Sequence, residues 1–231
     1  MIDIHSHILP GIDDGAKTPE VSLKMLTDSF KQGVRVCAAT PHAVLHNSDS
    51  VEEFLKKRQR SAELLDSFLT GAKNEIPKLL YGAEVYLDND VSEYQGIERL
   101  CITGSPLLLV EFSSVNNVSA YSERLYNLTL KGIVPVLAHV ERYAFTWELL
   151  RELSDINVIC QLNSSTVAGM YGRRFLNELY NEGIGVVVGS DMHNMSTRRS
   201  FMKKAYDRVK KHHQALAEDA FVSGLAEYIK I

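Results

Sequence analysis

The chain begins Met1-Ile2-Asp3-Ile4-His5-Ser6-His7, a short apolar segment that runs directly into two histidines. An apolar run of this kind predicts a strand. Because side chains alternate along an extended backbone, His5 and His7 would point to the same side. Two imidazoles in that position can chelate one divalent ion. The alternative is a pair of histidines in a surface loop.

The same unit, an apolar segment followed by a longer amphipathic one, recurs along the chain. Thr18 is a plausible N-cap, Pro19 suits the first helical position, and Gly33 ends the helix that they open. We expect strands at 1–4, 34–40, 78–85, 107–112, 133–138, 158–162 and 184–188. Further helices are expected at 51–69, 119–131, 145–153 and 173–181, with a helical tail from 199 that breaks near His213.

Seven such repeats predict an α/β fold. The strand segments are almost continuously apolar, as parallel strands buried on both faces are. Without a long polar linker, residues 1–231 are expected to form a single domain. Two architectures fit this pattern, a closed parallel barrel and an open doubly wound sheet. The first strand lacks a glycine-rich dinucleotide-binding turn after it, which favours the barrel.

The composition excludes several functional classes. Of 231 residues, 45% are hydrophobic and 23% charged, which is typical of a globular domain. Lys and Arg number 25 against 29 Asp and Glu, so a general nucleic-acid partner is not expected. Three widely spaced cysteines argue against a disulfide framework and for the reducing cytoplasm. We find neither a signal peptide nor an apolar run of the roughly 18 residues needed for membrane insertion.

Polar side chains gather at the carboxyl ends of the expected strands, which meet on one face of a parallel βα fold. Each has a simpler explanation when taken alone. His42 after its strand could be a structural histidine, and Asp14, in Asp13-Asp14-Gly15, could belong to a turn. Glu84 and Glu111 each end an apolar run and could pair with an arginine, since a buried carboxylate needs a partner.

Taken together, these residues favour a metal cluster. The candidate ligands are His5, His7, Asp14, His42, Glu84, Glu111, His139, Asp191 and His193. Nine groups are too many for one tetrahedral ion and suit two or three divalent ions with a bridging carboxylate. The mixture of nitrogen and oxygen ligands fits Mn, Fe or Zn better than Ca.

Two arginines point to a phosphorylated substrate. Arg142 lies three residues after His139, and Arg198 lies five residues after His193. A guanidinium group binds phosphate oxygens in a bidentate manner, although most arginines are simply solvated or paired at the surface. A cysteine-dependent phosphatase is excluded, because no cysteine is followed by an arginine six positions later. The chain also has no P-loop and no nucleophile elbow.

The motifs resemble those of a known family. Residues 1–7 followed by Asp13-Asp14-Gly15 are similar to the opening of the PHP (polymerase and histidinol phosphatase) superfamily. Five further segments resemble one branch of this superfamily. They are Tyr81-Gly82-Ala83-Glu84, Glu111-Phe112, Ala138-His139-Val140-Glu141-Arg142-Tyr143, Gln161-Leu162-Asn163-Ser164-Ser165 and Ser190-Asp191-Met192-His193-Asn194. This branch consists of the bacterial manganese-dependent protein-tyrosine phosphatases of capsule and exopolysaccharide loci.

The resemblance implies a distorted seven-stranded (β/α) barrel of the PHP type with Mn at the carboxyl ends of its strands. It implies a first ion held by His5, His7, Glu84 and Asp191. A second would be held by Glu84, Glu111 and His139, and a third by Asp14, His42 and His193. Arg142 and Arg198 would bind the phosphoryl group, Asp191 would support catalysis, and His42 is a rim histidine able to assist the leaving tyrosine oxygen.

The function implied by the resemblance is hydrolysis of protein phosphotyrosine by water activated at the ions, without a covalent intermediate. The implied substrate is the phosphotyrosine-bearing tail of a bacterial tyrosine kinase that controls polysaccharide export. A PHP phosphatase acting on a small metabolite such as histidinol phosphate is the nearest alternative. A metal amidohydrolase would typically add a bridging lysine in a middle strand. The remaining alternative is a metal-stabilised interaction module without turnover.

Overall fold

The computed structural model describes residues 1–71, 75–112 and 118–229, and within these ranges every strand pairing is parallel. One sheet has three strands in the order β1-β2-β4, and the other has six in the order β3-β5-β6-β7-β8-β9. The strands are β1 (Ile2–Asp3), β2 (Val36–Ala39), β3 (His42–Ala43), β4 (Lys78–Tyr81), β5 (Glu84–Tyr86), β6 (Leu107–Glu111), β7 (Val134–Leu137), β8 (Ile159–Asn163) and β9 (Val186–Gly189).

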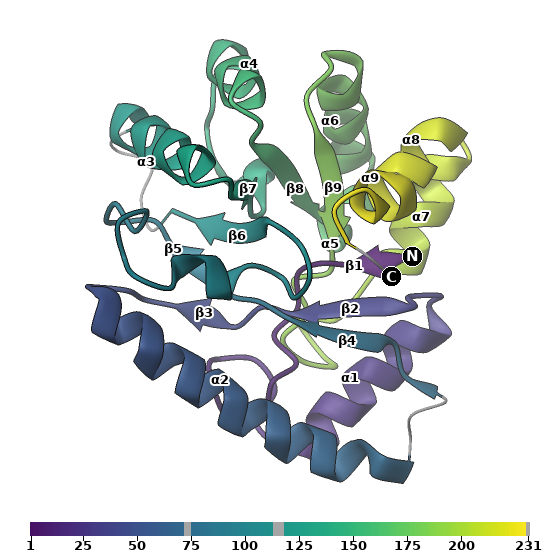
Figure 1. Cartoon of the computed structure of the whole chain (residues 1–231). Helices are drawn as coiled ribbons and strands as arrows, with labels where there is room; N and C mark the ends of the chain where they lie inside the picture. The colour runs from purple at the N-terminus through teal and green to yellow at the C-terminus, as the bar shows by residue number, and fades with distance from the viewer. Residues whose placement is uncertain (72–74, 113–117, 230–231) are drawn as a thin grey trace.

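Helices surround the strands (Figure 1). Helices α1 and α2 lie on the side of the three-stranded sheet, whereas α3, α4 and α6 lie outside the six-stranded one. The helices are α1 (Pro19–Lys31), α2 (Ser48–Phe68), α3 (Val118–Leu130), α4 (Trp147–Asp155), α5 (Ser164–Val167), α6 (Met170–Asn181), α7 (Met202–Lys210), α8 (Gln214–Glu218) and α9 (Gly224–Ala226). Short 3₁₀ turns include η1 (Leu69–Gly71), η3 (Ile97–Leu100) and η4 (Val140–Arg142), and a π-helical turn, η5 (Asp219–Ser223), joins α8 to α9.

All seven expected strand segments are extended, but the described chain contains nine strands. The expected strand at 78–85 is divided into β4 and β5, and β3 was not predicted. Both differences arise where the chain bends, at Pro41 and Gly82. Pro41 has no backbone N–H to donate to a ladder, and a Cβ on Gly82 would approach Ile102 Cγ1 to 3.1 Å. The two-residue β3 is too short to produce a sequence pattern.

The expectation of a closed seven-stranded barrel is corrected by this topology. In the described residues, the chains that follow β1 and β9 form no named strand pair but an isolated parallel bridge between Ser6 and Met192, with backbone hydrogen bonds from His7 N to Met192 O and from Asp191 N to His5 O. The polar atoms of Ser6 are used elsewhere: its N–H donates to Thr40 Oγ1, and its Oγ donates to Ala38 O at 2.6 Å. These bonds tie Ser6 to the chain of β2. The fold is α/β with two parallel sheets that do not join into one closed ladder.

The two faces of each strand pack against different apolar groups. In β6, Leu108 and Val110 join the core that includes the inner faces of the helices. Leu107 and Leu109 instead face a second cluster between the sheets, which Leu225 from the C-terminal region also enters. Residues 107–111 are all buried, as expected for strands covered on both sides. The interior is therefore apolar up to the level at which the polar side chains begin.

Local signals set the helix ends. Thr18 occupies the N-cap position of α1 as predicted, but its side chain makes no capping hydrogen bond. Helix α2 begins at Ser48 rather than 51, because Asn47 and Ser50 form a reciprocal capping box. The predicted break in the tail is present, and His213 caps α8 by accepting a hydrogen bond from Leu216 N at 3.0 Å. Among the described residues, no helix combines the length and apolarity required to cross a membrane.

Candidate metal centre

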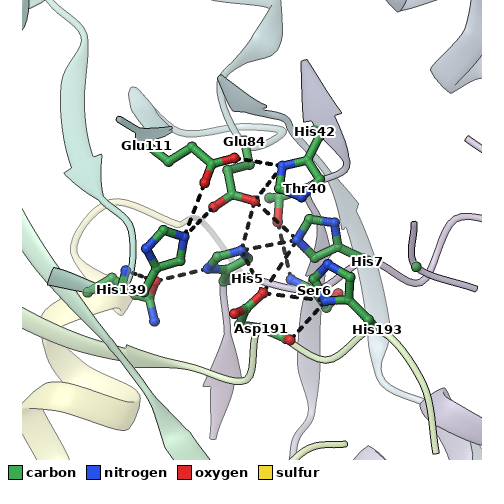
Figure 2. Close-up of polar contacts among 12 residues, drawn as sticks. His5, Ser6, His7, Thr40, His42, Glu84, Glu111, His139, Asp191 and His193 are labelled. Carbon is green, nitrogen blue, oxygen red and sulfur yellow. Dashed lines mark hydrogen bonds and ion pairs between the residues drawn. The ribbon is translucent and has the colours of Figure 1, made fainter. Parts of the chain in front are cut away.

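All nine residues predicted as ligands lie in one cluster at the carboxyl ends of the strands. Figure 2 labels all of them except Asp14. They come from distant parts of the sequence and are brought together by the parallel order of the strands. The chain after β1 carries His5, His7 and Asp14, the chain after β7 carries His139, and the chain after β9 carries Asp191 and His193. Strands β3, β5 and β6 carry His42, Glu84 and Glu111. Four of the nine, His5, His7, Glu84 and His193, are essentially inaccessible to solvent.

The hydrogen bonds of His5 and His7 leave one nitrogen of each ring facing the cluster. His5 Nδ1 lies 2.9 Å from Gln161 Oε1, and His7 Nδ1 lies 2.7 Å from Asp13 Oδ2. Since those oxygens only accept, both Nδ1 atoms are donors, and in the neutral form that binds metal both Nε2 atoms carry lone pairs. The two Nε2 atoms are 3.2 Å apart, and Glu84 Oε2 is 3.2 and 3.1 Å from them. Three acceptors that face one another fit a shared cation.

Glu84 lies between the two halves of the cluster. Its Oε1 is 3.1 Å from His139 Nε2, and its Oε2 is 3.1 Å from His42 Nδ1. Glu111 contacts the same two rings, at 3.4 Å to His139 Nε2 and 2.7 Å to His42 Nδ1. Burial disfavours the charged form of Glu84, but the neighbouring imidazoles outweigh it and hold its pKa well below the ordinary value. A charged carboxylate in this central position can bridge two ions.

Asp14 and His193 form the outer part of the cluster. His193 Nδ1 lies 3.0 Å from the carbonyl oxygen of Asp191, and its Nε2 points toward Asp14 Oδ1 at 3.2 Å. His42 Nε2 reaches the same Asp14 oxygen at 3.5 Å. The rings of His7 and His193 are stacked with centroids 3.7 Å apart. The Asp14 side chain is exposed, so this part of the cluster opens to solvent.

Three groups of potential ligand atoms are compact, each with its members within 4.8 Å of one another. They consist of His5, His7 and Glu84; of His42, Glu84 and Glu111; and of His7, Asp14, His42 and His193. Compared with the three expected ligand sets, His42 takes the place of His139 beside the two glutamates, and His7 joins the outer set. Asp191 Oδ1 lies 3.5 Å from His5 Nε2 and 3.6 Å from His7 Nε2, next to the first set.

Several buried atoms of the cluster have no hydrogen-bond partner among the described residues. They are His42 Nδ1, Glu84 Oε2, Glu111 Oε1, His139 Nδ1 and His193 Nε2. Some of them approach one another closely, but without the geometry of a hydrogen bond. A native interior pairs nearly all of its buried polar atoms, so a group of unpaired ones requires an explanation. Divalent cations would satisfy most of these atoms, and the imidazole and carboxylate donors suit such ions.

The protonation of the imidazoles also reflects the missing positive charge. Burial lowers the pKa of His5, but Glu84 and Asp191 outweigh it and raise that pKa to about 9. Burial likewise opposes the charged form of His42, yet Glu111 and Glu84 raise its pKa to about 10. In protein without metal, protons therefore provide part of the charge that the carboxylates demand.

Both predicted arginines reach the cluster through Asp191. Arg142 Nη2 donates to Asp191 Oδ2 at 2.7 Å, and Arg198 Nη2 donates to Asp191 Oδ1 at 2.9 Å. Arg198 Nη1 also lies 3.3 Å from Asp14 Oδ2. Each guanidinium is partly exposed, so its remaining N–H groups can meet a ligand at the mouth. The arrangement places two cations beside the candidate metal site, where an anionic group would bind.

Sequence reasoning missed the residues that orient the ligands. Asp13 fixes the ring of His7, and hydrogen bonding to His7 overcomes burial and lowers the pKa of Asp13 to about 2. Gln161 Oε1 accepts from His5 Nδ1 and from the backbone N–H of His139, both at 2.9 Å. Asn163 Nδ2 donates to Asp191 Oδ2 at 2.8 Å. Asp13, Gln161 and Asn163 belong to the quoted motifs, but their partners come from other elements.

Comparisons with known proteins identify a family and relatives for this chain. A family model described as "Capsular polysaccharide synthesis, CpsB/CapC" matches residues 1–229. The chain is 33% identical over 243 residues to the tyrosine-protein phosphatase CpsB of Streptococcus pneumoniae, covering 96% of this chain and 95% of that protein. It is 34% identical over 214 residues to the tyrosine-protein phosphatase YwqE of Bacillus subtilis, covering 89% of this chain and 82% of YwqE.

Solved structures give the same result. A structure described under "YwqE from Bacillus subtilis and CpsB from Streptococcus pneumoniae, unique metal-dependent tyrosine phosphatases" matches with a TM-score of 0.77 and 28% identity. The match covers 95% of this chain and 91% of that one. A TatD-like protein from Archaeoglobus fulgidus matches with a TM-score of 0.52 and 10% identity, covering 97% and 98% of the two chains. The second likeness concerns the fold alone and relates it to TatD-like barrels.

Proposed function

This chain belongs to the CpsB/CapC family of capsular polysaccharide synthesis, and we propose that residues 1–231 form one metal-dependent domain that hydrolyses phosphotyrosine in proteins. Its relatives are named tyrosine-protein phosphatases, and a structural neighbour is described as metal-dependent. The chain is an enzyme of this class, a phosphoric monoester hydrolase. The relatives do not support the alternative of a small-metabolite phosphatase acting on histidinol phosphate.

One observation carries the metal assignment: buried polar atoms from five segments lack hydrogen-bond partners among the described residues. Those of His42, Glu84 and Glu111 face one another. The proposed ligands are His5, His7, Asp14, His42, Glu84, Glu111, His139, Asp191 and His193. We assign two or three divalent ions to them, with manganese as the metal used by the enzyme and iron or zinc as possible substitutes. Glu84 is the proposed bridge, because its two oxygens face different imidazoles.

Bound divalent ions would lower the pKa of water and neutralise charge on the phosphoryl oxygens. The side chains of this protein do the rest. Arg142 and Arg198 are held at the mouth by Asp191, and their free N–H groups bind the phosphoryl oxygens in a geometry suited to phosphate. Asp191 keeps both cations in place and faces His5. His42 has 21% of its side chain exposed and is the rim histidine assigned to assist departure of the tyrosine oxygen.

The proposed substrate is the phosphotyrosine-bearing tail of a bacterial tyrosine kinase that controls polysaccharide synthesis or export. A tyrosine phosphatase requires a tyrosine kinase to make its substrate, and the family description refers to capsular polysaccharide. An exposed mouth formed by Asp14 and the two arginines suits a phosphorylated side chain on a polypeptide. We place this reaction in the cytoplasm, because Cys37, Cys101 and Cys160 are all free thiols.

The test is hydrolysis before and after removal of metal. Purified protein is treated with a chelator, and its turnover of p-nitrophenyl phosphate, a phosphotyrosyl peptide, a phosphoseryl peptide and histidinol phosphate is measured with and without added Mn. We expect the stripped protein to be inactive and Mn to restore turnover of the two aryl phosphates. Asp191→Ala should stay inactive, whereas Asp207→Ala, which removes an exposed surface carboxylate, should behave as wild type. Full activity after stripping would refute the metal assignment.

A further inference from the structure

A cavity of about 500 Å³ lies beside the metal centre, between α4 and α6 and the chain that follows η4. Its wall is mixed: five aromatic residues line it together with the charged side chains of Glu141, Arg174 and Glu178. The aromatic residues are Tyr143, Phe145, Trp147, Tyr171 and Phe175. In Figure 1, α4 and α6 stand next to each other on the outside of the six-stranded sheet. The lining residues lie near the first turns of both helices and just after β7, so the cavity is near the end of the sheet that carries the cluster.

A row of rings connects the cluster to this cavity. The ring of Tyr143 lies 5.9 Å from that of His139 and is stacked on Phe145 at 5.1 Å. Tyr143 directly follows Arg142, which donates to Asp191. On the far side of the cavity, Phe175 lies 6.1 Å from Trp147 and 6.3 Å from Tyr171. The aromatic side of the cavity thus lies next to the mouth where the phosphoryl group is proposed to bind.

Glu141 separates the cavity from the cluster and has an unused acceptor. Its Oε1 accepts from the backbone N–H of Asn163 at 3.0 Å, and Asn163 in turn donates to Asp191. Its Oε2 is buried and has no hydrogen-bond partner among the described residues. Glu141 thereby links the wall of the cavity to Asp191 through Asn163.

We propose that this aromatic cavity is a subsite for the polypeptide substrate and binds an apolar or aromatic side chain close to the phosphotyrosine. The inference rests on the proposed function, since a protein substrate must extend beyond the phosphoryl group. The distance along the row of rings from His139 through Tyr143 to Phe145 equals the length of roughly three residues of extended peptide, at about 3.3 Å per residue. The lining rings would stack on an aromatic side chain or pack on an aliphatic one.

The size of the cavity favours one side chain over a second copy of the protein. A stable interface between copies buries on the order of 1,600 Å², which is far more surface than this cavity offers. Tyr171, at its rim, is 71% exposed, so its ring is free to contact a bound peptide. The same exposure means that Tyr171→Ala removes little packing from the folded protein, which makes it a suitable test variant.

The experiment uses the metal-loaded enzyme and a set of phosphotyrosyl peptides in a Gly-Ser background. One leucine or tryptophan is placed at each position up to four residues before or after the phosphotyrosine. We expect one position to lower KM by about tenfold relative to the unsubstituted peptide. Tyr171→Ala should lose most of that gain, with turnover of p-nitrophenyl phosphate unchanged. Tyr126→Ala, which alters a 47% exposed tyrosine on α3, should keep the preference.

The outcomes separate this inference from the proposed function. Equal KM values for all peptides, or a preference that survives Tyr171→Ala, would overturn the subsite while leaving the phosphatase intact. A wild-type enzyme that hydrolyses no aryl phosphate would overturn both. Light scattering on the same variants tests whether a second copy of the protein occupies the cavity instead. A change of oligomeric state in Tyr171→Ala without a change in peptide KM would assign the cavity to a second copy.

Discussion

Replacing Gln161 with leucine is expected to weaken metal binding without touching any proposed ligand. Gln161 is fully buried in β8, and its Oε1 accepts two hydrogen bonds of 2.9 Å, from His5 Nδ1 and from the backbone N–H of His139. Its Nε2 donates to Asn163 Oδ1 at 3.0 Å. The bond to His5 keeps the proton on Nδ1, so that Nε2 faces Glu84. Leucine has a similar volume but accepts no hydrogen bond.

The magnitude follows from the two donors that would lose their acceptor. A buried donor left unpaired costs about 1–3 kcal/mol, so the metal-free variant should be about 2–4 kcal/mol less stable than wild type if the site partly relaxes. Loss of a residue that orients a metal-bound histidine typically lowers metal affinity by about 10–100-fold. Gln161→Glu preserves the acceptor for both donors and should retain most of the affinity.

Metal affinity is measured by competition with a chromogenic chelator, and stability by urea unfolding of the metal-free protein. NMR of ¹⁵N-labelled histidines, recorded above pH 9 where His5 is neutral, adds a direct readout, because Nδ1–H and Nε2–H tautomers give different nitrogen shifts. Gln59→Leu, on the exposed face of α2, is the matched control and should change neither quantity. The reasoning would be refuted if Gln161→Leu bound metal as tightly as wild type with His5 still in the Nδ1–H tautomer.

Three further predictions concern the same site. Gly189→Ala places a Cβ 2.7 Å from His5 Cβ and should cost about 1–3 kcal/mol of stability together with part of the bound metal, measured by thermal melting and elemental analysis. Arg198→Ala should lower kcat/KM for p-nitrophenyl phosphate by about 100-fold at unchanged metal content; an unchanged kcat/KM would contradict its role. In metal-free protein, the pKa values of about 9 for His5 and 10 for His42 exceed the ordinary value of a histidine. The stability that these two charged imidazoles give the folded state is therefore complete below pH 6.5 and declines as pH rises through 9–10. A free energy of unfolding in urea that does not change across that range would disprove this prediction.

The sequence predicts the strands because they are short, apolar and parallel, and it predicts the candidate ligands because each follows such a strand. Local pattern is sufficient for Glu111, which continues the inward-facing alternation of Leu107 and Leu109 in β6. It does not predict β3, nor the division of one expected strand into β4 and β5 at Gly82. At Gly82 the backbone lies against residues distant in sequence, such as Ile102. How far the chains after β1 and β9 pair is not encoded in any periodicity, and in the described residues this pairing is the single bridge between Ser6 and Met192.

Orienting residues are harder to predict than ligands for a physical reason. A ligand is recognised by its own donor atom and by its place at a strand end. A residue such as Gln161 orients the ligands through two acceptor contacts, one to a residue 156 positions away and the other to a residue 22 positions away. Glutamine is not itself typical of any chemistry. Asp13 illustrates the same point, because Asp13-Asp14-Gly15 contains two carboxylates and only the fold shows that Asp13 binds His7 while Asp14 faces His193.

The arrangement of burial explains how this fold maintains a charged centre. Beneath the cluster, Leu109, Val136 and their neighbours form a dry interior that holds the strand ends rigidly in position. Above it lie carboxylates and imidazoles whose unpaired atoms oppose folding. The apolar layer therefore supplies the free energy that keeps the polar layer assembled. Bound cations would pair with these polar atoms and so raise the free energy of unfolding. It follows that metal loading should raise the melting temperature of the wild-type protein, and should do so far less once Glu84, which both compact inner groups share, is replaced by glutamine.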